Sequence, residues 1–419
     1  MPGGIKIYHL KEIYKNMLNV KNQFPFFTNN PGITYMDSAA TTQKPRIVLD
    51  KLVDFYTTHN ANAGRSSYPI ANQLTNEVEE VREKVGKFIN ASKKEEIIFT
   101  SGATDGFNKI AYTLGIHYLK DGDEVLYCPQ DHKSFVLPWF KVQRLVENMG
   151  VAIRLVPFRV NKMGSIDRDD LFSKVTDKTK IINATHIHNI YGADSDINKI
   201  RDWLGDKDVI INVDAAQSVG HRLVDVQQLG ADILSFSGHK MFAIQGVGAT
   251  FITKKLHQFM EPIFVGGSNG VKLHDSEVEV TNFSQAYESG TQNYAGILTL
   301  GKAIEFIEQL GIENIYIHLS ELTQYLLQKL RQLPKIEFVY GPNFWSCADG
   351  AGILSFKVGG LSASEAGFML AENGILVRTG DHCISSRDEF TNTIRISMHV
   401  YNTTDDIDFL IKILKTICK

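Results

Sequence analysis

The sequence predicts an α/β fold, with a large domain on a mainly parallel seven-stranded sheet and a small α+β C-terminal domain. From Glu96 onward, short apolar runs alternate with helical stretches, as in a parallel sheet covered by helices on both faces. After Gly290 this alternation gives way to mixed helices and strands. The length of 419 residues also exceeds what one compact core usually holds.

The first hundred residues carry three recognisable patterns. A short helix is expected over residues 10–18, followed by an extended arm. The segment Thr34–Pro45, TYMDSAATTQKP, begins like a strand and continues with small hydroxylated residues, which suits a loop near a ligand. Apolar residues then recur at helical spacing from Leu74 to Phe88, and Asn90 is a reasonable stop.

The alternating region supplies the strands of the expected sheet. Seven apolar runs lead into polar loops or helices: IIFT, VLYCP, IRLVP, KIINATHI, VIINVDAA, DILSFSGHK and ATFITKK. Later in the chain, one leucine stripe predicts a helix that Pro334 ends: Leu319, Leu322, Leu326 and Leu330. We expect residues 30–295 to form the large domain, and residues 1–29 with 296–419 to form the small one.

Composition excludes several classes of function. The chain is 43% hydrophobic and 22% charged, with a formal net charge of −3, so nothing favours binding to nucleic acid or to an anionic membrane. No apolar run is long enough to span a bilayer, and the N-terminal residues lack a signal or transit pattern, which predicts a cytoplasmic protein. Four scattered cysteines form neither a disulfide framework nor a metal site: Cys128, Cys347, Cys383 and Cys418.

Two strand ends carry the strongest chemical signal. The runs Val209–Val213 and Ile233–Phe236 read as buried strands, and Asp214 follows the first while Lys240, in SFSGHK, follows the second. Ligands of open parallel sheets bind outside the carboxyl ends of the strands, so the two side chains would share one crevice. An acid and an amine so placed suit pyridoxal 5'-phosphate (PLP), which needs a partner for its pyridine nitrogen and an amine for its aldehyde. Taken alone, Asp214 is more often a strand-end residue that caps a helix, and Lys240 is more often a surface lysine.

Other strand ends carry weaker signals. The loop Thr100–Asn108, TSGATDGFN, follows a strand and opens a helix, so its amides and the Thr104 hydroxyl could bind a phosphate. His132 could lie against a cofactor ring and move protons, although a capping or core histidine is the more common case. Asn189 could hold a substrate or cofactor oxygen, or simply occupy a turn.

Two residues near the C-terminus are candidates for substrate chemistry. Cys383, in LVRTGDHCISS, lies in a loop with Arg378 and His382 nearby, which suits a nucleophilic thiolate. Cys128 and Cys418 lie in apolar patterns and are expected to be inert. Arg395 lies between two isoleucines of a strand, so it either faces inward and binds a carboxylate or lies on a wet face.

These motifs resemble those of the class V aminotransferase family, PLP-dependent enzymes of fold type I, and more narrowly the group II (SUF-type) cysteine desulfurases. The resemblance covers nearly the whole chain, through YMDSAATTQKP, TSGATDGFN, DH, HNIYG, VDAAQSVG, SFSGHK, ESGTQN, VRTGDHC and RISMHVYNT. It implies that L-cysteine is converted to L-alanine, with a persulfide formed on Cys383 that supplies sulfur for iron–sulfur clusters or a related product. Asp381 departs from the histidine common at this position, and its negative charge would oppose thiolate formation.

The resemblance also assigns roles to individual residues. Lys240 is implied to bind PLP covalently and to move the substrate α-proton, while Asp214 partners the ring nitrogen and Cys383 accepts the sulfur. His132 would stack on the ring and Gln217 would bond its hydroxyl. The phosphate group would be held by Thr104, Ser237, His239 and, from a second subunit of a homodimer, Thr291. Ala103 is also implied to contact the cofactor. The substrate carboxylate would be held by Asn189, Arg378 and Arg395, with Asn189 also near the cofactor.

Two alternatives stay open at this stage. The first is a PLP-dependent lyase, selenocysteine lyase or aminotransferase of the same fold, in which Cys383 is not the sulfur acceptor. The second is a non-catalytic binding or scaffold protein on this fold. A requirement for a keto acid, or pyruvate in place of alanine as the product, would favour the first alternative over a desulfurase.

Overall fold

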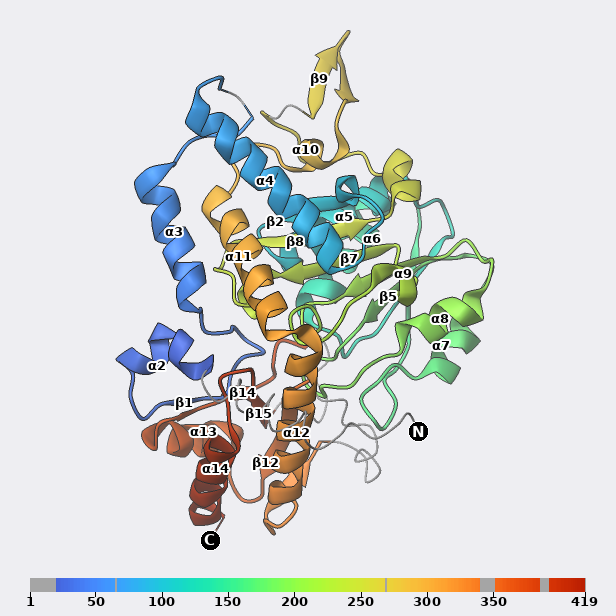
Figure 1. Ribbon diagram of the computed structural model, residues 1–419. Helices are drawn as coiled ribbons and strands as arrows, with labels where there is room; N and C mark the ends of the chain where they lie inside the picture. Colours follow the sequence, from blue (N-terminus) through green and yellow to red (C-terminus); the bar gives the residue numbers. More distant parts are fainter. Residues whose placement is uncertain (1–19, 65, 268–269, 340–350, 385–391, 419) are drawn as a thin grey trace.

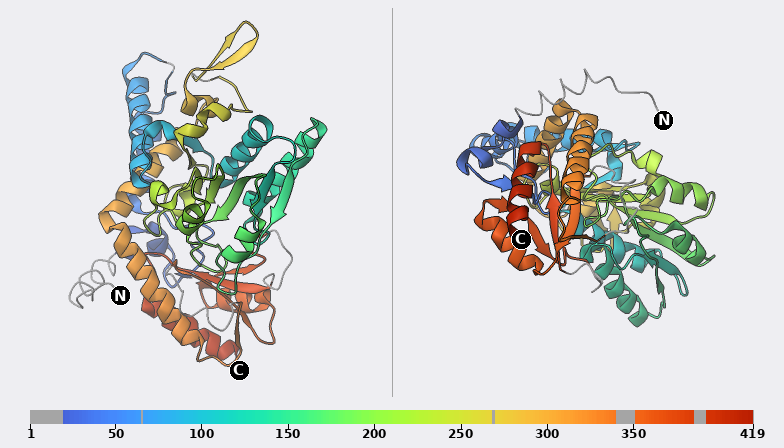
Figure 2. Two further views of the ribbon diagram at one scale, coloured as in Figure 1. Left: turned by 90° about the vertical axis from the view of Figure 1, so that its right-hand side faces the viewer. Right: turned by 90° about the horizontal axis from the view of Figure 1, so that it is seen from below.

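The computed structural model describes residues 20–64, 66–267, 270–339, 351–384 and 392–418. The helix expected over residues 10–18 and the Cys347 thiol lie outside these ranges. The chain divides into a larger part around one sheet and a smaller part around another. The two parts lie at opposite ends of the molecule, as two perpendicular views show (Figures 1 and 2).

A seven-stranded sheet forms the centre of the larger part. In spatial order its strands are β2 (Ile97–Thr100), β8 (Gly248–Ile252), β7 (Ile233–Ser237), β6 (Ile210–Asp214), β5 (Thr179–Thr185), β3 (Glu124–Tyr127) and β4 (Arg154–Pro157). Of these seven strands, β8 alone runs in the direction opposite to the other six. The predicted mainly parallel seven-stranded sheet is confirmed, and each of the seven apolar runs supplies one strand.

Helices cover both faces of this sheet because successive side chains of a strand point to opposite faces. Ile97 and Phe99 of β2 belong to the apolar cluster that includes α4 (Pro69–Phe88) and α11 (Tyr294–Leu310). Ile98, between them, belongs to the cluster that includes α5 (Ala103–His117) and α6 (Lys133–Asn148). α3 (Arg46–Thr58) packs against α11 on the outside of the first layer (Figure 1).

The smaller part is built on a four-stranded antiparallel sheet. Its spatial order is β11 (Ile336–Phe338), β12 (Ile353–Val358), β15 (Thr393–Ser397) and β14 (Arg378–Gly380). Three helices accompany it: α12 (Ile312–Leu330), α13 (Ala363–Glu372) and α14 (Thr404–Ile417). The long α11 and α12 run one after the other from the larger part to the smaller (Figure 1). The domain boundary at residues 295 and 296 stays a prediction.

Shorter elements complete the described chain. They are η1 (Val20–Gln23), α2 (Pro25–Asn29), β1 (Thr34–Tyr35), η2 (Lys94–Glu96), α7 (Arg168–Lys174), α8 (Ile197–Leu204), α9 (Val226–Leu229), η3 (Gly238–Lys240), η4 (Lys254–Phe259), β9 (Val271–His274), β10 (Glu277–Val280), α10 (Phe283–Tyr287) and β13 (Ile375–Leu376). β1 pairs with β13 and ties the early chain to the smaller part. The β9–β10 hairpin projects from the opposite end of the molecule (Figure 2).

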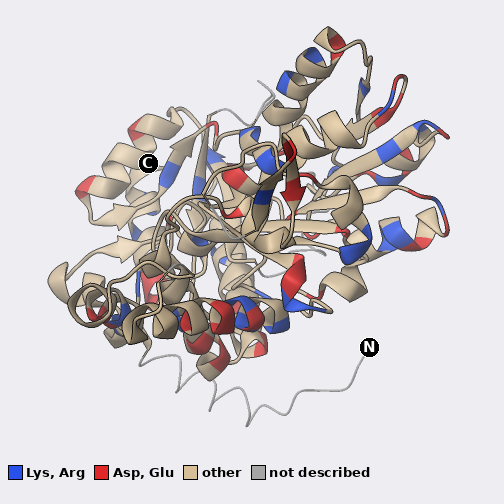
Figure 3. Cartoon of the chain, turned by 90° about the horizontal axis from the view of Figure 1, so that it is seen from above, with Lys and Arg blue, Asp and Glu red and all other residues tan. Residues whose placement is uncertain are grey.

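Both predicted helical stripes are confirmed. The stripe from Leu74 to Phe88 lies in α4, and the leucine stripe lies in α12, which ends at Leu330 before Pro334. No helix in the described ranges combines the length and the apolar character needed to cross a membrane. Basic and acidic residues are interspersed over the described elements (Figure 3).

Candidate active site

The carboxyl ends of the parallel strands and the edge of the smaller sheet enclose a cavity of about 240 Å³. Twelve of the thirteen predicted site residues line it: Ala103, Thr104, His132, Asn189, Asp214, Gln217, Ser237, His239, Lys240, Arg378, Cys383 and Arg395. The thirteenth, Thr291, is exposed and lies outside this cavity. Residues more than 270 positions apart in the chain are therefore brought into one space by the fold.

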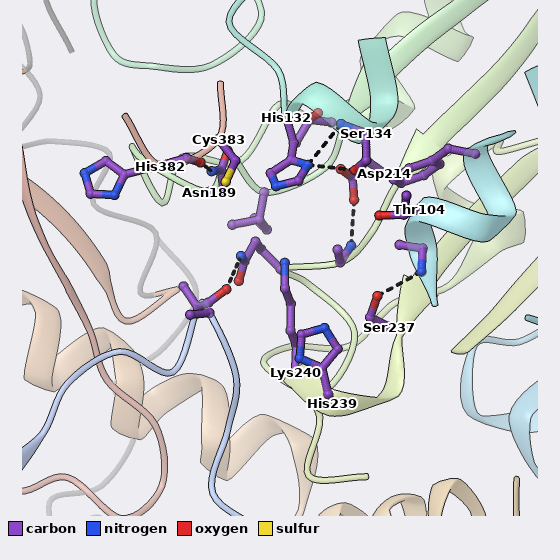
Figure 4. Close-up of a pocket in the computed structure, with 18 of the residues that line it drawn as sticks. Thr104, His132, Ser134, Asn189, Asp214, Ser237, His239, Lys240, His382 and Cys383 are labelled. Carbon is purple, nitrogen blue, oxygen red and sulfur yellow. Dashed lines mark hydrogen bonds between the residues drawn. The ribbon is translucent and has the colours of Figure 1, made fainter. Parts of the chain in front are cut away.

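Lys240 and Asp214 face the same cavity, as their strand positions predict. Asp214 is the last residue of β6, and Lys240 ends the short turn η3 directly after β7 (Figure 4). Burial lowers the pKa of Lys240 to about 8, and the Asp214 carboxylate opposes this shift. Burial also raises the pKa of Asp214, while the Ala216 amide, which donates to it at 2.9 Å, and the Lys240 ammonium act in the other direction. The amine is thus closer to its neutral, nucleophilic form than an exposed lysine.

The N-terminus of α5 closes one end of the cavity. Gly102 precedes the helix with φ +148 and gives it no side-chain cap. The Ala103 amide donates to Ser237 Oγ at 2.8 Å, so the α5 and β7 ends are joined. Thr104 and Ser237 lie together on the side of Lys240 that faces the α5 N-terminus (Figure 4). A helix N-terminus with hydroxyl groups beside it is suited to a phosphate group.

His132 contributes a neutral imidazole to the wall of the cavity. It is the N-cap residue of α6, and its Nδ1 accepts from the Ser134 amide at 3.3 Å. Since Nδ1 accepts, the proton of the neutral ring lies on Nε2. Burial lowers the pKa of His132 to about 3, and the nearby Lys240 charge adds to the effect. The ring is therefore uncharged at neutral pH.

Arg395 is buried, which decides between the two interpretations of this strand residue. It is only 3% exposed, and its guanidinium bonds Asp37 Oδ1 at 3.2 Å and the Asn189 carbonyl at 3.1 Å. Its Nε is buried with no hydrogen-bond partner among the described residues. Arg378 pairs with Arg395 across β14 and β15, so two guanidinium groups reach the cavity from one sheet edge.

Cys383 lies on the far side of Lys240 from the phosphate end, next to Asn189 (Figure 4). Its side chain is half-buried, and the Arg378 Nη2 donates to its Sγ at 3.8 Å. His382 and Cys383 both have positive φ, +50 and +62, which L-residues rarely adopt and which structures retain where the surroundings enforce it. The His382 ring points away from the Cys383 thiol and bonds Thr393 Oγ1 at 2.7 Å. The charged group beside the thiol is therefore the Arg378 guanidinium.

The other two described cysteines do not belong to this site. Cys128 and Cys418 are both buried, as expected for inert thiols. Burial raises the pKa of Cys128 well above the ordinary value, which disfavours its reactive thiolate form. Neither of them lines the cavity.

Some contributing residues were not predicted. Asp37, in the segment expected near a ligand, pairs with Arg395; Ser134 orients His132; and Lys133 pairs with Asp381 at 2.9 Å. The only sequence signal for these residues was the hydroxylated run before Pro45, which indicated a loop near a ligand but assigned no role to any residue in it. The charge of Asp381, expected to oppose thiolate formation, is compensated by the Lys133 ammonium.

The residues present fit PLP. The cavity contains an amine, an acid opposite it and a helix N-terminus, which match the aldehyde, ring nitrogen and phosphate of that cofactor. Gln217 adds an independent observation: its Nε2 donates to the Ala39 carbonyl at 2.9 Å, whereas its buried Oε1 has no partner among the described residues. Such an oxygen can accept from a ring hydroxyl.

Comparison with known proteins agrees with this geometry. The family model for aminotransferase class-V matches residues 34–410. A probable cysteine desulfurase from Halalkalibacterium halodurans is 36% identical over 405 residues, covering 95% of this chain and 97% of that protein. The apo cysteine desulfurase from Thermococcus onnurineus NA1 has a TM-score of 0.87 at 28% identity, covering 96% and 97% of the two chains. The cysteine desulfurase CsdA (S-sulfonic acid) from Escherichia coli has a TM-score of 0.86 at 28% identity, covering 96% and 98%.

Proposed function

The chain belongs to the class V aminotransferase family as a PLP-dependent cysteine desulfurase, and on that premise we propose that Cys383 is the thiol that accepts sulfur from L-cysteine. The observation that carries the proposal is the presence of Lys240, Asp214 and Cys383 on the walls of a single cavity. A lyase requires the first two residues, whereas a sulfurtransferase also requires a thiol within reach of the bound substrate.

The cofactor would be held at three places. Lys240 would take its aldehyde, Asp214 and Gln217 its ring nitrogen and hydroxyl, and the α5 N-terminus its phosphate, with His132 against the ring. PLP, when bound, supplies an electron sink for the substrate α-carbon. Lys240 Nζ would carry the α-proton, and its lowered pKa of about 8 suits an amine that both takes up and releases a proton near neutral pH.

The substrate carboxylate would bind at the edge of the smaller sheet. Arg378 and Arg395 reach the cavity as neighbours in β14 and β15, and Asn189 lies beside them. Asp37 holds one side of the Arg395 guanidinium and leaves its Nε for another acceptor. A carboxylate placed there would leave the substrate sulfur on the side of the cavity that Cys383 occupies.

The sulfur transfer balances without another reactant. The Cys383 thiolate attacks the substrate sulfur, so an S–S bond forms and the substrate C–S bond breaks. The electron pair of the broken bond remains on the substrate β-carbon, which takes a proton and leaves as L-alanine. Enzyme thiol and L-cysteine thus become enzyme persulfide and L-alanine. Arg378, at 3.8 Å from Sγ, provides a positive charge beside the attacking thiolate.

The proposal includes partners. A homodimer would bring the exposed Thr291 of a second copy to the phosphate, consistent with its place outside the cavity of its own chain. A sulfur-acceptor protein would take sulfur from the half-exposed Cys383, for iron–sulfur clusters or a related product in the cytoplasm. The group II (SUF-type) assignment belongs to the same proposal.

Replacing Cys383 by alanine tests the role of this thiol. We expect Cys383→Ala to form no persulfide or alanine from L-cysteine, even with a reductant present, while the visible absorbance of bound PLP remains. Cys418→Ala, which changes a buried thiol that does not line the cavity, is the matched control and should retain activity. Undiminished sulfide release by Cys383→Ala, with pyruvate as the product, would contradict the proposal in favour of a lyase.

A further inference from the structure

The turn that carries Cys383 is tied to the start of α6. The Lys133 amide donates to the Cys383 carbonyl at 2.8 Å, and His132 forms an isolated antiparallel bridge with Ile384. The thiol turn therefore touches the segment that also presents the His132 ring to the cavity. A movement of this turn relative to α6 would change the distance between the thiol and the space where substrate sulfur lies.

Side chains add a second connection at the same place. Lys133 Nζ contacts Asp381 Oδ2 at 2.9 Å, and Asp381 Oδ1 accepts from the Cys383 amide at 3.0 Å. One carboxylate thus bonds the backbone of the thiol residue and a lysine of the opposite element. The other Cys383 neighbour, Arg378, approaches from β14 and is independent of this connection.

The conformation of the turn explains why such a connection is needed. Two successive residues, His382 and Cys383, have positive φ, a conformation that relaxes unless neighbouring contacts hold it. Asn189 Nδ2 bonds the His382 carbonyl at 2.9 Å and holds one side. The contacts with Lys133 hold the other.

We propose that Lys133 and Asp381 are positioning residues, whose ion pair holds the Cys383 turn against the N-terminus of α6 with the thiol directed into the cavity. The inference rests on the proposed role of Cys383 and concerns how that thiol is held. Neither residue touches the reacting atoms. They act through the backbone of the turn.

The test measures alkylation of Cys383 in the PLP-loaded enzyme without L-cysteine, followed by mass spectrometry of its peptide. Asp381→Asn removes the charge but keeps an oxygen for the Cys383 amide, and Lys133→Met removes the ammonium but keeps the backbone bond. An exposed ion pair contributes about 0.2–1 kcal/mol, so each variant should raise the detached population and the alkylation rate about 1.4- to 5-fold.

The sign of the two effects separates positioning from simple electrostatics. If the charges acted only on thiolate formation, Asp381→Asn would accelerate alkylation and Lys133→Met would slow it. Positioning predicts acceleration in both, and a double variant no faster than the faster single one. In the unchanged enzyme, 1 M salt should screen the ion pair between Lys133 and Asp381 and accelerate alkylation to a similar degree. Salt should affect the alkylation rate of the variants less.

Lys87→Met, which breaks the exposed ion pair with Glu83 at 2.7 Å on α4, is the matched control and should leave the rate unchanged. Opposite signs in the two single variants, or unchanged rates in both, would overturn the proposal. Because alkylation needs no turnover, such a result leaves the sulfur-acceptor role to be decided by Cys383→Ala alone.

Discussion

At the scale of single residues, the position of Lys240 depends on the carbonyl group of the residue before it. The His239 carbonyl accepts from the Thr42 amide at 3.0 Å, from the Thr41 and Thr42 hydroxyls at 3.2 and 3.1 Å, and from Lys44 Nζ at 3.0 Å. The hydroxylated segment of the sequence thus surrounds the lysine turn. Its proximity to a ligand was predicted, but its contact with this carbonyl was not.

Thr42 offers a direct test of this arrangement. Its buried hydroxyl donates to the His239 carbonyl and accepts from the Phe242 amide at 2.9 Å, and Phe242 has φ +75. Thr42→Val keeps the shape but leaves the buried Phe242 amide without its acceptor, which typically costs about 1–3 kcal/mol. We expect that decrease in the free energy of unfolding, measured with urea. Thr42→Ser keeps the hydroxyl and should lose less, so equal losses in the two variants would contradict the role of this bond.

Arg395 shows what residue-level prediction could not decide. Pattern alone left an inward and an outward orientation equally open, because the alternation of a short strand does not identify its partner. The partner is Asp37, which is 358 positions away in the chain. By contrast, Asp214 and Lys240 were placed correctly because they lie at the carboxyl ends of neighbouring parallel strands, and the ends of such strands share one edge of the sheet.

At the scale of elements, α5 carries the proposed phosphate site and lies unusually close to the sheet. A Cβ atom at Gly106 would come within 2.9 Å of Ser235 Oγ on β7. Ser235 and Thr250, on β7 and β8, bond each other at 2.8 Å beneath the helix, so neither hydroxyl moves without cost. The glycine lets the first turn of α5 approach the strand ends that supply Ser237 and Lys240.

Gly106→Ala should therefore displace the N-terminus of α5. Overpacking of this kind costs about 1–3 kcal/mol, against a gain of up to about 1 kcal/mol from replacing a helical glycine. We expect a lower unfolding midpoint and weaker PLP binding. The affinity for PLP is measured by titrating the apo protein with PLP. Gly86→Ala in α4 is the matched control, since its Cβ would meet only ordinary contacts at 3.7 Å or more, and it should be neutral or stabilising. Unchanged PLP affinity in Gly106→Ala would contradict the argument.

At the scale of the whole molecule, the sequence predicted the local pattern better than the assembly. The seven strands and the two striped helices were predicted because burial on one or both faces leaves a visible periodicity. The order of the strands, and the pairing of β1 with β13 some 340 residues later, leave no such trace. Thr291 is a similar case, since its predicted role involves a second copy of the chain.

The meeting of the two sheets buries many uncharged histidines. Burial is the first cause that lowers the pKa of seven of them from the ordinary 6.5 to about 4 or about 3: His132, His186, His188, His221, His239, His318 and His382. Burial also lowers the pKa of His399 well below its ordinary value. His221 and His399 pack in a tilted arrangement with ring centroids 4.4 Å apart, so the first to gain a proton would repel the second. His132, His239 and His382 line the cavity, and the other five are buried.

These histidines predict that the folded state weakens as pH falls below about 6.5. Between pH 6.5 and 4 the unfolded chain binds protons that the native state does not, so unfolding takes up protons and its free energy falls with pH, by up to about 1.4 kcal/mol per pH unit for each histidine. The full contribution is present above pH 6.5. Asp131, whose pKa burial raises to about 8, acts in the opposite direction, as do Asp37 and Asp214, whose pKa burial also raises, but these three groups are fewer than the histidines.

Urea unfolding of the protein at pH 7.5, 6.5 and 5.5 measures this pH dependence of stability. Substituting one buried histidine removes the contribution of that residue. His318 is 4% exposed and lies 3.1 Å from the Asn402 carbonyl through Nε2, a contact that a glutamine amide can replace. We expect His318→Gln to reduce the loss of stability between pH 6.5 and 5.5 by about 1 kcal/mol. His274→Gln, at a side chain 77% exposed, should leave that loss unchanged. Equal pH dependence in the two variants would mean that the His318 site accepts a proton without unfolding, and that burial at this junction does not keep the ring neutral.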